Sequence, residues 1–137
     1  MQSLVKKVAL PMLLAGTAAA TYGYTAIAGN KPTATVTINT STRTAEGAFG
    51  STRNSADSTQ FIYCDLDAFT TSMRLTCRAK NNAASPVDVS CTSTDTTLIG
   101  NIQKLSTDAD LKFTWNSSGV CTSVTVDRSS KWVLKNP

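Results

Sequence analysis

The sequence predicts a small, mainly β (α+β) domain: a single antiparallel sheet with one short helix at about residues 93–106 and two disulfides. Three observations carry this prediction. Threonines alternate with apolar residues in several short segments, and β-branched side chains at a two-residue period suit the pleated surface of a strand. A single segment changes to the period of a helix. Four cysteines occur in a chain of only 137 residues.

The first 28 residues have the three parts of a secretory signal peptide. Lys6 and Lys7 form a basic start, residues 8–15 are an apolar run, and small residues follow as far as Ala20, with a second Ala-x-Ala site at residues 26–28. The apolar run is shorter than the about 20 residues that a membrane-spanning helix needs. We therefore expect residues 1–28 to be removed, by cleavage after Ala20 or, by preference, after Ala28. Residues 29–137 would form one exported domain that is secreted, periplasmic or at the cell surface, without a membrane span.

Charge and composition narrow the classes of function. The net charge of +4 falls to +2 when Lys6 and Lys7 leave with the signal peptide, and such a nearly neutral domain does not favour nucleic acid as a partner. The chain contains no histidine, which excludes a Ser-His-Asp mechanism, and no spacing singles out a serine–lysine pair. We therefore expect that the protein is not an enzyme and that it binds no cofactor.

The cysteines Cys64, Cys77, Cys91 and Cys121 are even in number and follow an export signal, which indicates two disulfides. A metal site is disfavoured because the chain has neither a Cys-x-x-Cys pair nor a histidine. Four cysteines allow three connectivities, and the sequence does not decide among them. The sequential pairing, Cys64–Cys77 with Cys91–Cys121, is slightly preferred.

The N-terminal part of the mature chain contains the first expected strand. Residues 34–39 alternate regularly and predict a strand, and residues 41–46 are expected to form a turn or a second short strand. Residues 47–50 are flanked by glycines, which suggests a bulge or a close approach of two backbones. The polar residues 51–58 are expected to be a loop or an exposed edge.

The middle of the chain has the clearest strand pattern. Residues 60–64, 73–80 and 87–91 are expected strands, and the turn chemistry of residues 81–86 joins the last two. The period of two places the cysteine of residues 73–80 on the apolar face and its three cations on the wet face. In an antiparallel hairpin, Asp88 would lie across from Arg78.

The helix predicted at about residues 93–106 rests on apolar residues that share one helical face. Ser93 or Asp95 suits its N-cap, and Gly100 limits it to two or three turns because glycine costs a helix about 1 kcal/mol. The apolar face consists of Leu98, Ile99, Ile102 and Leu105.

The strand pattern returns after the helix. Residues 111–115 alternate, residues 116–119 are a hairpin turn, and residues 120–126 alternate again. This alternation puts Val124 on the face opposite Cys121. Residues 131–135 are expected to form a last strand.

Four residues are candidates for binding: Tyr63, Asp65, Asp67 and Trp132. The two aspartates lie two residues apart at a strand end, where they would point the same way, and an ordinary solvated loop is the preferred interpretation over acid–base chemistry or calcium. Tyr63 and Trp132 are aromatic side chains that can stack on a sugar or a base. Phe61, Phe113 and Trp115 are expected in the core.

Residues 51–64, Ser-Thr-Arg-Asn-Ser-Ala-Asp-Ser-Thr-Gln-Phe-Ile-Tyr-Cys, resemble a stretch found in a group of small exported bacterial proteins. That group shares Arg-Asn-Ser-Ala-Asp-Ser ahead of an aromatic residue and a first cysteine, followed by three further cysteines. The resemblance covers most of residues 45–135 and implies an export signal and two disulfides. The group has no established activity, so the resemblance transfers no catalytic or binding residue.

The leading functional expectation is a non-enzymatic secreted or cell-surface domain that acts by binding or structural packing. Its partner would be a protein or a surface polymer, with self-association included. One alternative is a subunit of an extracellular filament or coat, in which residues 33–39 add a strand to a neighbour; an ordinary first strand of its own domain is preferred for them. The other alternative is a small inhibitor or effector that presents a loop such as residues 68–72.

Overall fold

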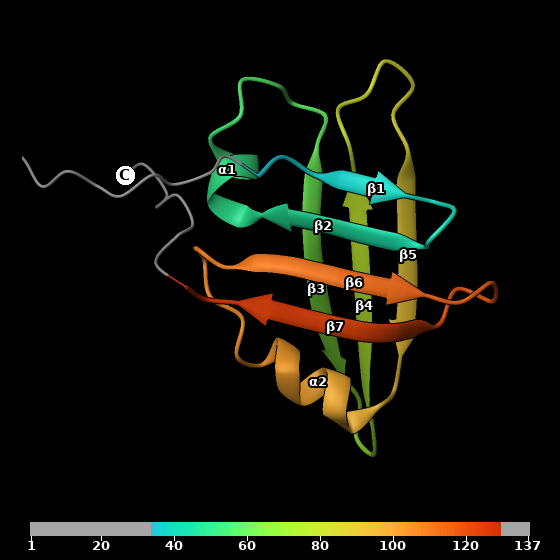
Figure 1. Cartoon of the computed structure of the whole chain (residues 1–137). Helices are drawn as coiled ribbons and strands as arrows, with labels where there is room; N and C mark the ends of the chain where they lie inside the picture. Colours follow the sequence, from blue (N-terminus) through green and yellow to red (C-terminus); the bar gives the residue numbers. More distant parts are fainter. Residues whose placement is uncertain (1–33, 130–137) are drawn as a thin grey trace, which may run out of the picture.

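The computed structural model describes residues 34–129, which form two packed antiparallel sheets and two short helices (Figure 1). The mainly β class and the two disulfides are confirmed. The strands divide between two sheets, whereas a single sheet was expected. The expected signal peptide 1–28, the last strand 131–135 and Trp132 lie outside the described residues.

The first sheet has the strand order β1-β2-β6-β7. Its inward side chains alternate along β2 and β6, and Ala45, Leu111 and Phe113 are fully buried. The predicted strands at residues 34–39, 111–115 and 120–126 are confirmed, with a first strand shorter than residues 34–39. The bounds are β1 Thr37–Asn39, β2 Thr44–Ala48, β6 Asp110–Trp115 and β7 Cys121–Asp127.

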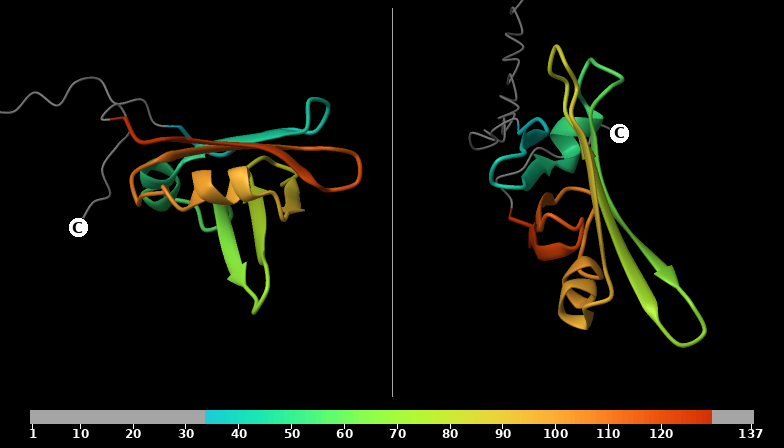
Figure 2. Two further views of the ribbon diagram at one scale, coloured as in Figure 1. Left: turned by 90° about the horizontal axis from the view of Figure 1, so that it is seen from below. Right: turned by 90° about the vertical axis from the view of Figure 1, so that its right-hand side faces the viewer.

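The second sheet consists of β3 Phe61–Ala68, β4 Met73–Lys80 and β5 Asp88–Ser93 in chain order. In Figure 1 it lies behind the first sheet, and the strands of the two sheets cross steeply. The core fills the space between the two layers. The end of the β3–β4 hairpin projects away from the rest of the molecule (Figure 2).

Helix α2, Thr96–Ile102, packs against β7 and β4 and buries Ile99 and Ile102. Asp95 is its N-cap and accepts hydrogen bonds from the backbone N–H groups of Thr97 and Leu98 at 2.8 and 3.1 Å. The predicted helix and one of its two predicted caps are therefore confirmed, at a shorter length. Neither helix in this part of the chain is long and apolar enough to cross a membrane.

A second helix, α1 Phe49–Arg53, stands where a loop or exposed edge was expected for residues 51–58. Apolar residues do not recur at a helical period in this segment, so the sequence did not predict the helix. Tertiary contacts hold it instead, because Ser51 is buried and its hydroxyl accepts the backbone N–H of Ala34 at 3.1 Å. The Arg53 guanidinium donates to the carbonyl of Thr107 at 3.3 Å.

The close backbone approach expected near residue 47 is present. A Cβ added to Gly47 would lie 3.2 Å from Val36 Cα and 3.4 Å from Ile62 Cγ2. Val36, which is 5% exposed, therefore packs directly on the bare backbone of β2. Its own N–H donates to Gln60 Oε1 at 3.0 Å. Ala34 and Val36, just before β1, are thus held by their own domain.

A β-bulge corrects the predicted alternation of residues 120–126. Thr114 pairs with Ser123 and Trp115 with Cys121, so Thr122 is an extra residue in β7. Cys121 and Val124 are consequently both buried, although strict alternation would put them on opposite faces. The bulge turns Cys121 towards the other sheet. The hairpin turn at residues 116–119 is as predicted, with Gly119 at φ 74°.

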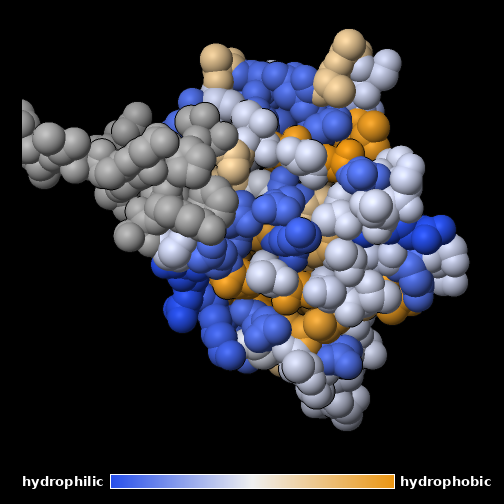
Figure 3. Space-filling view, viewed as in Figure 1, coloured by the Kyte–Doolittle hydropathy of each residue, from blue (hydrophilic) through white to orange (hydrophobic). Residues whose placement is uncertain are grey.

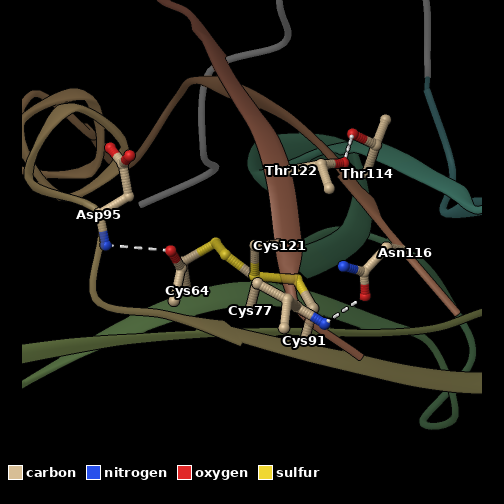
Figure 4. The surroundings of a disulfide bond; sticks show 10 residues. Cys64, Cys77, Cys91, Asp95, Thr114, Asn116, Cys121 and Thr122 are labelled. Carbon is tan, nitrogen blue, oxygen red and sulfur yellow. Dashed lines mark hydrogen bonds between the residues drawn. A yellow bond between two sulfur atoms is a disulfide. The ribbon is translucent and has the colours of Figure 1, made fainter. Parts of the chain in front are cut away.

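The two disulfides follow the slightly preferred connectivity. Cys64–Cys77 joins neighbouring strands of one sheet, while Cys91–Cys121 joins β5 to β7 and thereby links the two sheets. Figure 4 shows the two disulfides close together. A disulfide between the layers stabilises the sandwich because it restricts the unfolded chain.

Candidate binding face

Three of the four predicted binding residues share one surface. Tyr63, Asp65 and Asp67 alternate along β3, so their side chains lie on the side of the sheet that faces away from the core. The opposite side carries Ile62, which is buried. We define the outer face of β3–β4–β5 as this solvent side of the sheet. Its side chains include Phe61, Tyr63, Asp65, Asp67, Arg74, Arg78 and Asp88, and Phe69 of the turn after β3 lies beside Arg74.

Phe61 corrects a sequence prediction, because it lies on the outer face and was expected in the core. Ile62, its neighbour in β3, is the residue that is turned inward. The Phe61 ring lies 5.7 Å from the Tyr63 ring, centroid to centroid. The other two aromatic predictions hold, since Phe113 is fully buried and Trp115 packs against the core, 5.8 Å from the Phe113 ring.

Arg78 is fixed from two sides. Its Nε and Nη2 donate to the two carboxylate oxygens of Asp88 at 2.9 and 2.7 Å. Its guanidinium carbon stands 5.3 Å from the centre of the Phe61 ring. The Asp88 carboxylate, and then the Tyr63 hydroxyl, raise the pKa of Arg78 above its usual range. In return, the Arg78 guanidinium lowers the pKa of Asp88.

Arg74 repeats this arrangement nearer the end of the hairpin. Its Nε and Nη2 donate to Asp67 Oδ2 at 3.2 and 2.8 Å, and its guanidinium carbon lies 5.5 Å from the centre of the Phe69 ring. Phe69 is 54% exposed, the highest exposure among the large apolar side chains of the described part. Two arginines of β4 are therefore each held between a carboxylate and a phenylalanine ring.

Two carboxylates of this face, those of Asp67 and Asp88, form ion pairs with arginines of β4. Asp67 is committed to Arg74, and Asp65 lies opposite Thr76 across the strand pair. Both stand on the open side of a sheet, where water solvates them. Both aspartates lie within β3, which corrects the solvated loop that was expected for them, and their open setting differs from the closed site that acid–base work needs.

The turn before β3 has a structural role. Asp57 accepts the backbone N–H groups of Thr59 and Gln60 at 2.8 Å each, together with the side-chain amide of Gln60. These bonds, led by that of the Gln60 N–H, lower the pKa of Asp57 to about 2. Gln60 in turn accepts the N–H of Val36, so the turn before β3 holds the segment before β1.

The outer face of the other sheet has a different character. Figure 3 shows it as a surface of mainly hydrophilic and intermediate residues. A hollow of about 660 Å³ lies over β1 and β2, lined by residues such as Thr37, Thr44, Glu46 and Lys112. The Lys112 ammonium and the Glu46 carboxylate lie 3.2 Å apart. Within residues 34–129, no aromatic side chain lines this hollow.

In comparisons with known proteins, no family model, no curated protein and no solved structure matches the chain. The site is therefore defined by its own residues. Sequence reasoning found Tyr63, Asp65 and Asp67 but missed Phe69 as a partner of Arg74. The signal for both arginines was present, because the period of two had already placed them on the wet face.

Proposed function

We propose that the protein is a non-enzymatic exported domain that binds a protein partner through the outer face of β3–β4–β5. The observation that carries the proposal is the double fixation of Arg74 and Arg78, each by a carboxylate and a phenylalanine ring. Aromatic residues and arginine are enriched at the energetic centres of protein interfaces. Side chains that are already ordered lose less entropy on binding, which favours affinity.

The charge of this face supports a protein over a nucleic acid. Arg74, Arg78 and Lys80 of β4 are accompanied by an equal number of carboxylates: Asp65, Asp67 and Asp88. A phosphate backbone is bound by unbalanced positive charge, which this face lacks. Paired charges around aromatic rings instead match the polar surroundings of a protein interface.

Export is supported by the predicted signal peptide at residues 1–28 and by the two disulfides, since disulfides form and persist in oxidising compartments. The non-enzymatic part of the proposal is supported by the lack of histidine in the chain and by the ion-paired, open setting of Asp67. The function would then depend on shape and contacts, with no chemical step.

The test places a photoreactive amino acid at Ser90 and, as a matched control, at Thr125. Both are exposed strand residues, but Ser90 lies on the outer face of β3–β4–β5 and Thr125 on that of the other sheet. In the native source, the Ser90 position should cross-link to one defined protein and the Thr125 position should not. Adding Tyr63→Ala should abolish the Ser90 adduct.

Three results of this experiment would contradict the proposal. Equal adducts from both positions would show that the surface has no preference. An adduct that persists in the Tyr63→Ala variant would show that binding does not depend on the aromatic side chains of the outer face of β3–β4–β5. A heterogeneous smear in place of one defined band would indicate a surface polymer.

A second candidate is an inhibitor or effector that inserts the end of the β3–β4 hairpin into its partner. The specific observation is Phe69 at the projecting end, where its N–H donates to the carbonyl of Ser72 at 2.8 Å and closes the turn (Figure 2). In that case Phe69→Ala should abolish the cross-linked adduct, and Tyr63→Ala should leave it intact. The two variants thus separate the candidates.

The filament alternative requires residues 33–39 to leave their own domain. Within the described residues, Thr37–Asn39 pair with β2 and Val36 is buried against Gly47. The preferred interpretation, an ordinary first strand, is confirmed for these three paired residues. Assembly through another surface would be detected as cross-links between copies of the chain.

A further inference from the structure

Cys77 has a cysteine directly across from it on each side. It is the register partner of Cys64 on β3 and of Cys91 on β5, since β4 is the central strand of its sheet. Cys121 approaches from the other sheet, and the Sγ atoms of Cys77, Cys91 and Cys121 all lie within 4.8 Å of one another (Figure 4). Directly opposed residues of neighbouring strands are close enough for a disulfide.

We propose that the four cysteines form a thiol–disulfide exchange site. A low-molecular-weight thiol breaks the Cys64–Cys77 disulfide by forming a mixed disulfide with Cys64. The released Cys77 thiolate then attacks Cys91 and displaces Cys121. The outcome is a Cys77–Cys91 disulfide within one sheet and a free thiol at Cys121. This inference is independent of the proposed function, because it uses none of the residues of the outer face.

Exposure selects the sulfur at which the exchange begins. Cys64 is only partly buried, whereas Cys77, Cys91 and Cys121 are 0%, 1% and 3% exposed. A thiolate from solvent therefore attacks Cys64 Sγ, and Cys77 is the leaving group. The new Cys77 thiolate is buried beside an intact disulfide, which favours the intramolecular step over escape to solvent.

The exchange balances without any net oxidation or reduction. In the first step the external thiolate forms a bond to Cys64 Sγ as the Cys64–Cys77 bond breaks, and the electron pair goes to Cys77. In the second step the Cys77 thiolate forms a bond to Cys91 Sγ as the Cys91–Cys121 bond breaks. Cys121 then takes the proton that the external thiol gave up, so two disulfides and one thiol are present before and after.

The exchange changes how the two sheets are connected. Cys91–Cys121 joins β5 to β7 across the layers, whereas Cys77–Cys91 would join neighbouring strands of one sheet. In the structure the same region also has a hydrogen bond from the Thr92 N–H to the carbonyl of Gly119, at 3.0 Å, which involves no cysteine. The site is therefore a switch between a sandwich with a covalent link between its layers and one without it.

The test treats the folded mature protein with reduced glutathione at mildly alkaline pH, followed by acid quenching and alkylation of free thiols. Tryptic cleavage after Arg74, Arg78, Lys104 and Lys112 places the four cysteines on four separate peptides, which mass spectrometry can distinguish. The expected products are glutathione on Cys64, a disulfide between the Cys77 and Cys91 peptides, and alkylated Cys121.

Two results would overturn the proposal. One is glutathione on Cys64 with alkylated Cys77 and an intact Cys91–Cys121 bond. The other is a folded protein in which no Cys77–Cys91 peptide forms at all. Protein unfolded in urea is the matched control, because it should also form Cys64–Cys91 and Cys64–Cys121, and those pairs in the folded sample would mean unfolding in place of local exchange.

A variant provides a second readout that needs no external thiol. Cys64→Ser leaves Cys77 unpaired beside Cys91–Cys121, so this protein should be isolated as a mixture of Cys91–Cys121 and Cys77–Cys91 forms. Circular dichroism would establish that it is folded. A folded Cys64→Ser protein that holds only Cys91–Cys121 would contradict the intramolecular step.

Discussion

Arg78 and Asp88 are joined by two hydrogen bonds although they are not register partners. Ser90 lies opposite Arg78, and Lys80 lies opposite Asp88, so the ion pair runs diagonally across β4 and β5. The sequence predicted the two residues to lie across from each other, and their interaction is confirmed with this diagonal offset. The diagonal places the guanidinium over the Phe61 ring as well.

Arg78→Lys should separate binding from stability. Lysine keeps the charge but loses the planar fork that bonds Asp88 twice and stacks on Phe61. Both partners remain substantially exposed to solvent, so the urea midpoint of unfolding should change little. We expect the yield of the adduct from the Ser90 position to fall about tenfold, as for a central interface residue. A large loss of stability would mean that the arginine is structural.

Asp57 makes stability depend on acid pH. Its pKa is about 2 in the folded chain against an ordinary 3.8. Because the folded-state pKa is the lower one, its stabilising effect is complete above about pH 4 and is lost as the pH falls towards 2. Asp57→Asn should therefore lower the urea midpoint at pH 6, and the gap to wild type should narrow below about pH 4. A gap that does not depend on pH would contradict this assignment.

The disulfide between the sheets should account for a large part of the stability. Cys91 and Cys121 are 30 residues apart, and closing a loop of that length stabilises by roughly 3–4 kcal/mol through the unfolded chain. Replacing both cysteines by alanine should lower the free energy of unfolding by about that amount, measured by urea titration. A change below about 1 kcal/mol would indicate that the bond is not formed in the native protein.

Two glycines should respond to alanine in opposite ways. A Cβ at Gly100 of α2 meets nothing within 4 Å, so Gly100→Ala should stabilise the protein by about 0.5–1 kcal/mol. A Cβ at Gly47 would crowd the backbone of Val36 at 3.2 Å, so Gly47→Ala should destabilise it. Thermal unfolding measures both. Equal shifts in the melting temperature would argue against the close packing of Val36 on β2.

Replacing Phe113 or Phe69 by alanine should change the free energy of unfolding by very different amounts, because one is a core residue and the other a surface residue. Phe113 is fully buried, and Phe113→Ala should cost about 3–5 kcal/mol of folding free energy. Phe69 is 54% exposed, and Phe69→Ala should stay within about 0.5 kcal/mol of wild type. Urea titration of both variants checks the assignment. A comparable loss at Phe69 would mean that the end of the hairpin packs on the body of the protein.

The strands and α2 could be predicted from the sequence because their signals are local. An apolar run indicated β3, alternation predicted β4 and β6, and Asp95 was one of two residues that suited the start of α2. The division into two sheets was not predictable in this way, because alternation does not say which strands pair. Strand β6 follows β5 in the chain, but the two strands lie in different sheets, and only long-range packing determines this. Helix α1 was missed for the same reason, since buried contacts of Ser51 hold it.

The candidate site was only partly predictable. Phe61 and Ile62 are adjacent and both apolar, so the sequence does not say which of them faces the core. The bulge at Thr122 could not be predicted either, because the order of polar and apolar residues in β7 does not mark which residue lacks a register partner on β6. What the sequence could predict was the wet side of β4, from which the positions of Arg74 and Arg78 follow.

The most direct test of protein binding by the outer face of β3–β4–β5 is the size of the mature protein recovered from its native source. We predict a complex larger than the monomer for wild type, a monomer for Tyr63→Ala, and an unchanged complex for the control Thr125→Ala. A wild-type protein that elutes as a clean monomer, or a complex that Tyr63→Ala leaves intact, would contradict the account.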